Sequence, residues 1–167
     1  MPFDDNAIAS GENLNNLKQS YSKLNSFKEG KVETLAEKNV INPEIYNLFT
    51  TEIDLLNVLA SHSQNQNIKE FLQQLSQKSE KELENLVARF PYLDQSLIQN
   101  PVFYGKFNAT NNFKKFLETD LEIVDVMGDS LRNISKQEDK DFVFNALNRH
   151  IKALEQLFSI MHLLTFY

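Results

Sequence analysis

The chain of 167 residues is long enough for one domain with its own hydrophobic core, and 41% hydrophobic against 24% charged residues is typical of a soluble globular protein. It contains no cysteine, which excludes disulfides, thiolate metal sites and cysteine nucleophiles. The net charge of −6, with lysines spread among acids, disfavours nucleic acid as a partner, because phosphate binding needs clustered Lys and Arg.

No apolar run approaches the length of a membrane span, and the acidic start is unlike a signal peptide. We therefore expect a cytoplasmic protein without membrane contact. Four glycines and four prolines are few for a turn-rich β fold and favour long helices. The abundance of Asn, Gln and Lys with little Gly is typical of an AT-rich bacterial genome.

We expect residues 1–41 to form an N-terminal region distinct from the rest of the chain. Residues 1–11 show no hydrophobic periodicity. Apolar residues then recur at heptad-like spacing, at Leu14, Leu17, Tyr21, Leu24 and Phe27. This pattern predicts an amphipathic helix that stops near Gly30 and lies on the remainder of the chain or on a second subunit.

Residues 42–167 contain four stretches with the periodicity of amphipathic helices. The first is expected to begin at Asn42 and Pro43, where Asn suits a cap and Pro suits the first helical position. A polar turn at 61–66 leads to the second, which should stop at Phe90. The third should be capped by Thr110 or Asn111.

A polar turn at 135–139 is predicted to separate the third helix from the fourth. The fourth has an apolar stripe in which Phe158 and Met161 are expected to face inward. The long connection 91–108 is rich in aromatic residues and should pack across the outside of the helices. The apolar end 163–167 should be docked or form a dimer contact.

The chain shows an internal duplication. Residues 51–60 and 119–128 follow one pattern of threonine, acid, aliphatic residue, acid and further aliphatic residues. After the following turn, 69–72 corresponds to 140–143. The chain therefore reads as two related helical hairpins.

Three polar residues interrupt the apolar stripes, namely Glu52, Asp120 and His150. Glu52 and Asp120 occupy equivalent positions in the two repeats, and Ser79 is the repeat partner of His150. Because each acid and its partner lie about equally far from their connecting turn, all four should meet at one level of the bundle.

Over residues 43–165 the chain resembles the ferritin-like superfamily of the rubrerythrin and bacterioferritin kind. The resemblance implies an all-α, ferritin-like four-helix bundle whose first-helix acids are Glu52 and Asp120 and whose remaining histidine is His150. Ser79 stands where the other histidine is expected, and Ser76 and Leu147 stand where each second-helix Glu is expected. The implied di-iron site has thus lost three of its ligands, and the resemblance implies a protein that is not an enzyme.

Two interpretations of Glu52, Asp120 and His150 remain open. A protonated His150 could pair with the acids as a structural cluster without any cofactor. Alternatively, the three side chains could hold a single divalent metal, with Glu82 as a further candidate ligand. We expect His62 and His162 to be surface residues.

The leading functional hypothesis is a helical protein that acts through protein contacts, and we expect a homodimer. The alternative is a protein that binds a metal or small ligand at the polar cluster. A histidine phosphotransfer role for His150 ranks third, because bulky Leu147 and Ile151 flank it.

Overall fold

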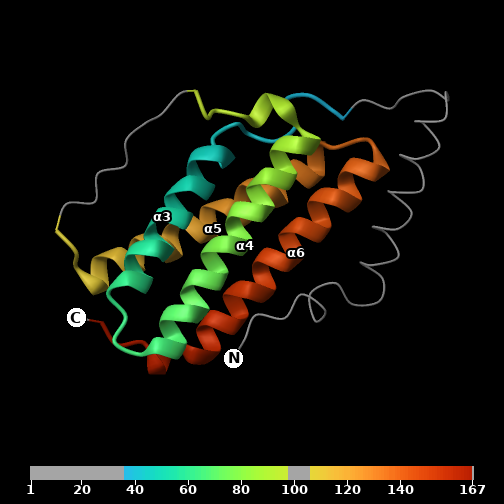
Figure 1. The fold of residues 1–167 in the computed structure, drawn as a ribbon. Helices are drawn as coiled ribbons and strands as arrows, with labels where there is room; N and C mark the ends of the chain where they lie inside the picture. Colours follow the sequence, from blue (N-terminus) through green and yellow to red (C-terminus); the bar gives the residue numbers. More distant parts are fainter. Residues whose placement is uncertain (1–35, 98–105, 167) are drawn as a thin grey trace.

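The computed structural model describes residues 36–97 and 106–166, and this part of the chain contains four long helices (Figure 1). They are α3 (Ile45–Ser61), α4 (Gln66–Arg89), α5 (Ala109–Asn133) and α6 (Gln137–Ile160), with short 3-10 helices η1 (Pro91–Leu93) and η2 (Met161–Leu163). The prediction of an all-α chain with four helices is confirmed. In the described ranges, no helix combines the length and apolar character that crossing a membrane requires. The helix expected within residues 14–27 lies outside the described residues.

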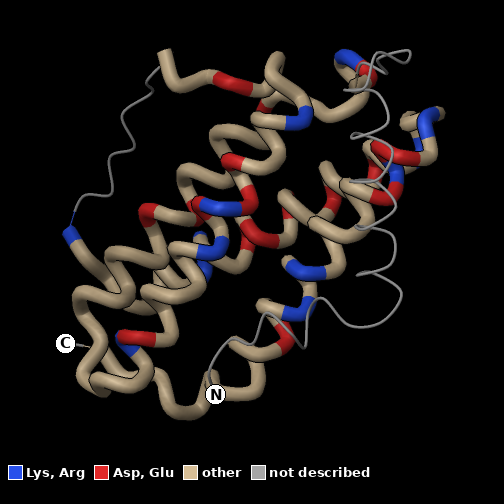
Figure 2. Tube along the Cα trace, turned by 45° about the vertical axis from the view of Figure 1, so that its right-hand side comes forward, with Lys and Arg blue, Asp and Glu red and all other residues tan. Residues whose placement is uncertain are grey.

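The four helices form a bundle in which α3 packs against α4 and α5, and α5 packs against α6. The start of α4, the start of α5 and the ends of α3 and α6 share one cluster of buried side chains. Consequently α4 and α5 run in the same direction, and each is antiparallel to its hairpin partner (Figure 1). Acidic and basic positions are intermingled along these helices (Figure 2).

A polar layer divides the bundle core into two apolar halves. One half gathers thirteen buried residues, among them Ile45, Phe49 and Val143, and the other gathers eleven, among them Leu59 and Leu157. Between them lie buried polar residues from all four helices: Glu52, Ser76, Ser79, Thr119, Asp120 and His150. Each helix therefore breaks its apolar stripe at the same height.

The helix boundaries follow from local capping. The side chain of Asn65 accepts hydrogen bonds from the backbone N–H groups of Asn67 and Ile68 and so caps the start of α4. The predicted cap of α5 was wrong by two or more residues, because Asn108 accepts the N–H of Asn111 at 3.0 Å. The α3 helix begins at Ile45, two residues after Pro43.

The predicted inward stripe of α6 was partly wrong. Phe158 is 49% exposed and Met161 is 38% exposed, whereas Ile160 is buried. The predicted turn 135–139 is shorter, since α6 begins at Gln137 and its first turn contains Asp139. Asp139 is fully buried, so this residue belongs to the interior and not to a polar loop.

The segments outside the helices are attached to the bundle. Ile41 is buried, and its N–H and carbonyl both bond the hydroxyl of Tyr92 in η1. Near the C-terminus, the N–H of Gln64 donates to the carbonyl of Thr165 at 3.0 Å. Ser63 and Phe166 form an isolated antiparallel β-bridge. Residues 164–166 are therefore docked, which confirms that alternative for the C-terminal end.

Candidate functional site

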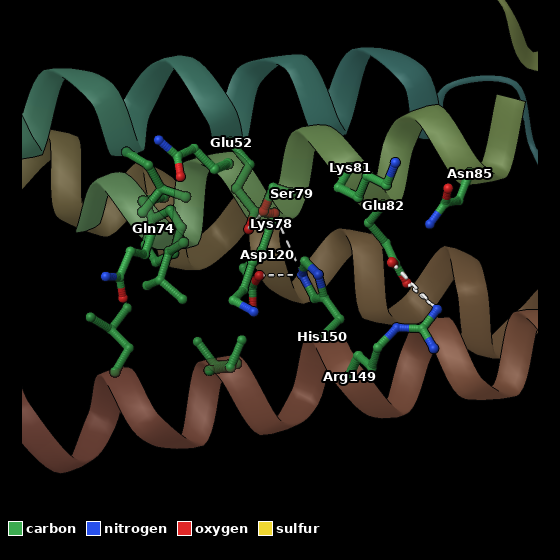
Figure 3. A pocket seen from close by; sticks show the side chains of 17 residues that line it. Glu52, Gln74, Lys78, Ser79, Lys81, Glu82, Asn85, Asp120, Arg149 and His150 are labelled. Atoms are coloured by element: carbon green, nitrogen blue, oxygen red, sulfur yellow. Dashed lines mark hydrogen bonds and ion pairs between the residues drawn. The ribbon is translucent and has the colours of Figure 1, made fainter. Parts of the chain in front are cut away.

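The central polar layer brings together one residue from each helix: Glu52 from α3, Ser79 from α4, Asp120 from α5 and His150 from α6 (Figure 3). Their side chains meet at one level, as the repeat spacing predicted. His150 is only 7% exposed, and the two acids are more deeply buried. Burial of this kind keeps a phosphoryl donor from the imidazole, which argues against the phosphotransfer hypothesis.

His150 Nε2 faces both carboxylates. It lies in ion-pair contact with Asp120 Oδ1 and 3.5 Å from Glu52 Oε2. Ser79 Oγ donates to the other Glu52 oxygen, Oε1, at 3.3 Å. Three buried atoms, Glu52 Oε2, Asp120 Oδ2 and His150 Nε2, have no aligned hydrogen-bond partner among the described residues. Buried polar atoms are rarely left without a hydrogen bond, and here Glu52 Oε2 and His150 Nε2 are held by ion-pair contacts alone.

Burial raises the pKa of the Glu52 carboxyl to about 8, with His150 opposing the rise and Asp120 adding to it. Burial lowers the pKa of the His150 imidazole, but the negative charges of Glu52, Asp120 and Glu82 outweigh burial and raise this pKa to about 9.

A pocket of about 380 Å³ opens between α4 and α6 and reaches the cluster (Figure 3). These two helices are not among the closely packed pairs of the bundle, which leaves room for it. On one side of the cluster the lining is mostly apolar, with Gln74 beside Leu56, Leu75, Phe116, Ala153, Leu154 and Leu157. On the other side it is polar.

The polar side of the pocket carries the pair Arg149 and Glu82. Arg149 Nη2 donates to Glu82 Oε1 at 3.0 Å, which joins α6 to α4 beside His150 (Figure 3). Burial raises the pKa of the Glu82 carboxyl above its ordinary value, and the nearby Arg149 offsets only part of this rise. The structure therefore places Glu82 against an arginine, and not within the group of three potential ligands.

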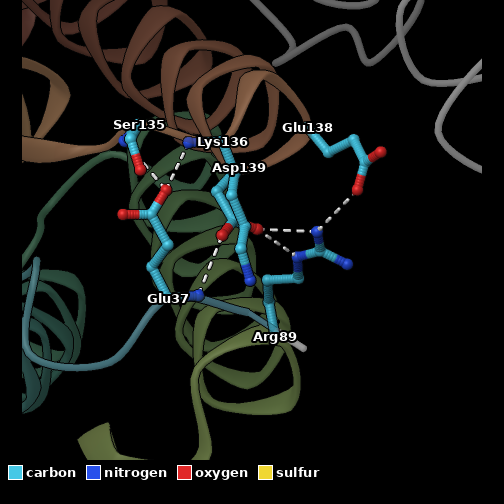
Figure 4. A network of polar contacts seen from close by, with 6 residues as sticks. All are labelled: Glu37, Arg89, Ser135, Lys136, Glu138 and Asp139. Atoms are coloured by element: carbon cyan, nitrogen blue, oxygen red, sulfur yellow. Dashed lines mark hydrogen bonds and ion pairs between the residues drawn. The ribbon is translucent and has the colours of Figure 1, made fainter. Parts of the chain in front are cut away.

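Sequence reasoning missed a second cluster of buried charges, which lies where the end of α4 meets the start of α6 (Figure 4). Arg89 donates to Asp139 Oδ1 through Nε at 2.9 Å and through Nη2 at 2.6 Å. Asp139 Oδ2 accepts the N–H of Glu37, whose own carboxylate accepts the N–H groups of Ser135 and Lys136. This network fixes the start of α6 and the residues that precede α3.

The other two histidines take no part in these clusters. His62 is half-buried at the end of α3 and stacks on Phe107, with ring centroids 3.7 Å apart. His162 is exposed on η2, as predicted.

Glu52, Asp120 and His150 form a group that could hold a metal ion, because each offers one ligand atom and these atoms lie within 4.8 Å of one another. Ligand atoms about 2.1 Å from a shared ion lie no more than about 4.2 Å apart, so a small side-chain shift would allow all three to bind one ion. Two carboxylates and one imidazole suit Mn(II), Fe(II) or Zn(II). Three protein ligands would leave positions open toward the pocket.

Comparison of the chain with protein-family models, with curated proteins and with solved structures gave no significant match.

Proposed function

We propose that this protein binds one divalent transition-metal ion through Glu52, Asp120 and His150. The observation that carries the proposal is the convergence of three buried ligand atoms without aligned hydrogen-bond partners at the floor of a pocket. Buried polar groups are normally satisfied, and a coordinated cation would satisfy these.

Charge also supports the proposal. A divalent ion balances the charges of two ionised carboxylates beside a neutral imidazole, so the metal-bound cluster would carry no net charge in the core. The fixed helical positions of the three ligands would hold the open side of the ion toward the pocket.

We further propose that the bundle is ferritin-like and that its metal site is what remains of a duplicated di-iron centre. In support, α4 and α5 run parallel, and the equivalent pairs Glu52/Asp120 and Ser79/His150 occupy one layer. Ser76 and Ser79 are buried where two further ligands would stand. One ion per chain, and not two, is therefore expected.

The proposal predicts stoichiometric metal binding that depends on His150. Protein purified without chelators and titrated with Mn(II), Fe(II) and Zn(II) should bind one ion per chain. His150→Ala and Glu52→Gln should each weaken binding by at least about 100-fold, because each removes a direct ligand. Calorimetry and metal analysis after dialysis measure both quantities.

His162→Ala is the matched control, because this histidine is exposed and distant in sequence from the cluster, and it should bind metal as wild type does. Wild-type protein without metal, together with a destabilised His150→Ala variant, would instead assign the cluster a purely structural role. Two ions per chain would contradict the loss of ligands at Ser76, Ser79 and Leu147.

As a second candidate, we infer a protein that acts through contacts with a second copy of itself. The observation in its favour is that Phe144 and Phe158 are each about half exposed on α6. They lie about four helical turns apart and therefore share one face of the helix. Large aromatic side chains on one exposed face are typical of an interaction surface.

This candidate predicts that the double variant Phe144→Ser/Phe158→Ser is monomeric while wild type is dimeric at micromolar concentration. Loss of two aromatic anchors should weaken a dimer by at least about 10-fold. Sedimentation measures the oligomeric state. Leu97→Ser, which alters a fully exposed side chain away from α6, should leave the dimer intact. A monomeric wild type would dismiss the candidate.

A further inference from the structure

We propose that the pocket between α4 and α6 binds a small organic monocarboxylate, whose carboxylate completes the coordination of the metal and whose apolar body lies along the far wall. This inference rests on the proposed metal site and identifies the ligand class that the site would take. Three observations support it: the pocket has an apolar part and a polar part, basic residues line it, and it lies on the side of the cluster where no helix supplies a metal ligand.

The pocket is divided by the cluster into two unlike parts. The lining residues Leu56, Leu75, Phe116 and Leu157 all belong to one apolar half of the core. Lys81, Glu82, Asn85 and Arg149 lie on the other side of the cluster (Figure 3). A ligand with its polar group at the cluster can therefore extend its hydrocarbon part in one direction only.

The charges around the pocket favour an anion. A divalent ion would balance the charges of Glu52 and Asp120. The other charged lining residues are three bases, Lys78, Lys81 and Arg149, and one acid, Glu82, which pairs with Arg149. This local excess of positive charge contrasts with the net charge of −6 of the whole chain. The metal ion and these basic side chains would repel a cationic ligand, whereas they would attract a carboxylate.

The open face of the metal would point toward the same space. Glu52, Asp120 and His150 come from three helices, and the fourth helix contributes only Ser79 to this layer. A ligand that enters the pocket would therefore approach a bound ion from the α4 side. A volume of about 380 Å³ is within the range of small-molecule sites, and its apolar lining residues suit a chain of a few methylene groups.

The test begins with Zn(II) titration in carboxylate-free buffer, so that failure of metal binding is recognised before any ligand is added and overturns both proposals. Hexanoate, acetate, hexanol and hexylamine are then titrated into the Zn(II)-loaded and the metal-free protein by calorimetry. Hexanoate should bind the loaded protein about 10- to 100-fold more tightly than acetate, because its extra methylene groups are buried. Hexanol and hexylamine should bind at least about 10-fold more weakly than hexanoate, because neither supplies an anionic ligand.

The matched variants are Ala153→Trp and Ser159→Trp, both on α6. The first fills the pocket one turn after His150 without replacing a ligand, and the second places the same side chain on the exposed face. Ala153→Trp should retain Zn(II) and lose hexanoate, whereas Ser159→Trp should retain both.

In the Co(II)-loaded protein, hexanoate should change the visible spectrum of the metal in wild type and Ser159→Trp, and leave it unchanged in Ala153→Trp. Metal binding with equal affinity for hexanoate and acetate would overturn the inference while the metal site stands. Equal hexanoate binding with and without Zn(II), or hexanoate binding that survives Ala153→Trp, would overturn it as well.

Discussion

The variant Glu52→Gln is expected to be about as stable as wild type at pH 5 and more stable by roughly 3 kcal/mol at pH 9, in the absence of metal. Burial raises the pKa of Glu52 from its ordinary 4.5 to about 8. The neutral acid is thus the form that the core accommodates, and the amide of glutamine resembles it. At pH 9 wild type must place the negative charge of Glu52 in the core, whereas the variant does not.

The direction of the pH dependence follows from two raised pKa values. The folded state holds the Glu52 proton at pH values where the unfolded chain has released it, so the stability associated with this group is present below pH 4.5 and is lost as the pH rises through 8. For His150, whose pKa rises from 6.5 to about 9, stability is present below pH 6.5 and lost as the pH rises through 9. Both groups predict a wild-type protein that weakens from about pH 5 to pH 9.

Urea unfolding of metal-free protein at pH 5, 7 and 9 measures these differences. Glu122→Gln is the matched control, because Glu122 is an exposed residue of α5, and this variant should follow wild type at every pH. A Glu52→Gln variant less stable than wild type at pH 9 would show that the ionised carboxylate is favourable in the core. The same variant serves the metal titration, since it removes a ligand without weakening the fold.

The position of the cluster could be predicted from sequence because a charged side chain in an apolar stripe is a strong local signal. Glu52, Asp120 and His150 each stand where the apolar stripe predicts a hydrophobic residue, and the expected hairpins place them at similar distances from their turns. Four helices of similar length then leave little choice about which residues share a layer. The contacts of His150 with both acids agree with that reasoning.

The face of each helix was harder to predict, because small polar residues can be buried when the helix backbone satisfies them. Thr119 and Ser130 are buried on α5, where their hydroxyls donate to the carbonyls of Lys115 and Met127. Ile123 is fully buried on the same helix, so the inward face of α5 contains hydroxyl residues as well as aliphatic ones. The pocket was missed for a related reason, since it depends on the spacing of α4 and α6.

Asp139 shows the limit of local patterns. An acid near the start of a helix is normally interpreted as a solvated residue that favours the positive helix end. Only the fold reveals that Arg89, at the end of another helix, lies against it and that the carboxylate is completely buried. No periodicity within α6 distinguishes this arrangement from an exposed one.

The variant Arg89→Ala is expected to lower the free energy of unfolding by about 3–5 kcal/mol, because it leaves the buried carboxylate of Asp139 without its charged partner. Two short hydrogen bonds to one oxygen are lost, and Asp139 is 0% exposed, so water cannot replace them without opening the helix end. Urea unfolding at pH 7 measures the loss. Arg132→Ala, which removes an exposed arginine paired with Asp129, should cost no more than about 1 kcal/mol.

The double variant Arg89→Met/Asp139→Leu distinguishes two contributions to the free energy of unfolding. One is the cost of burying an unpaired carboxylate, and the other is the net stabilisation by the Arg89–Asp139 ion pair. Replacing both charges by apolar side chains removes the desolvation cost together with the attraction, so this variant should recover most of the stability lost in Arg89→Ala. The N–H of Glu37 then loses its acceptor, which should limit the recovery by about 1 kcal/mol. A double variant as unstable as Arg89→Ala would mean that the pair stabilises the bundle directly, by holding α4 to α6 and to the segment before α3.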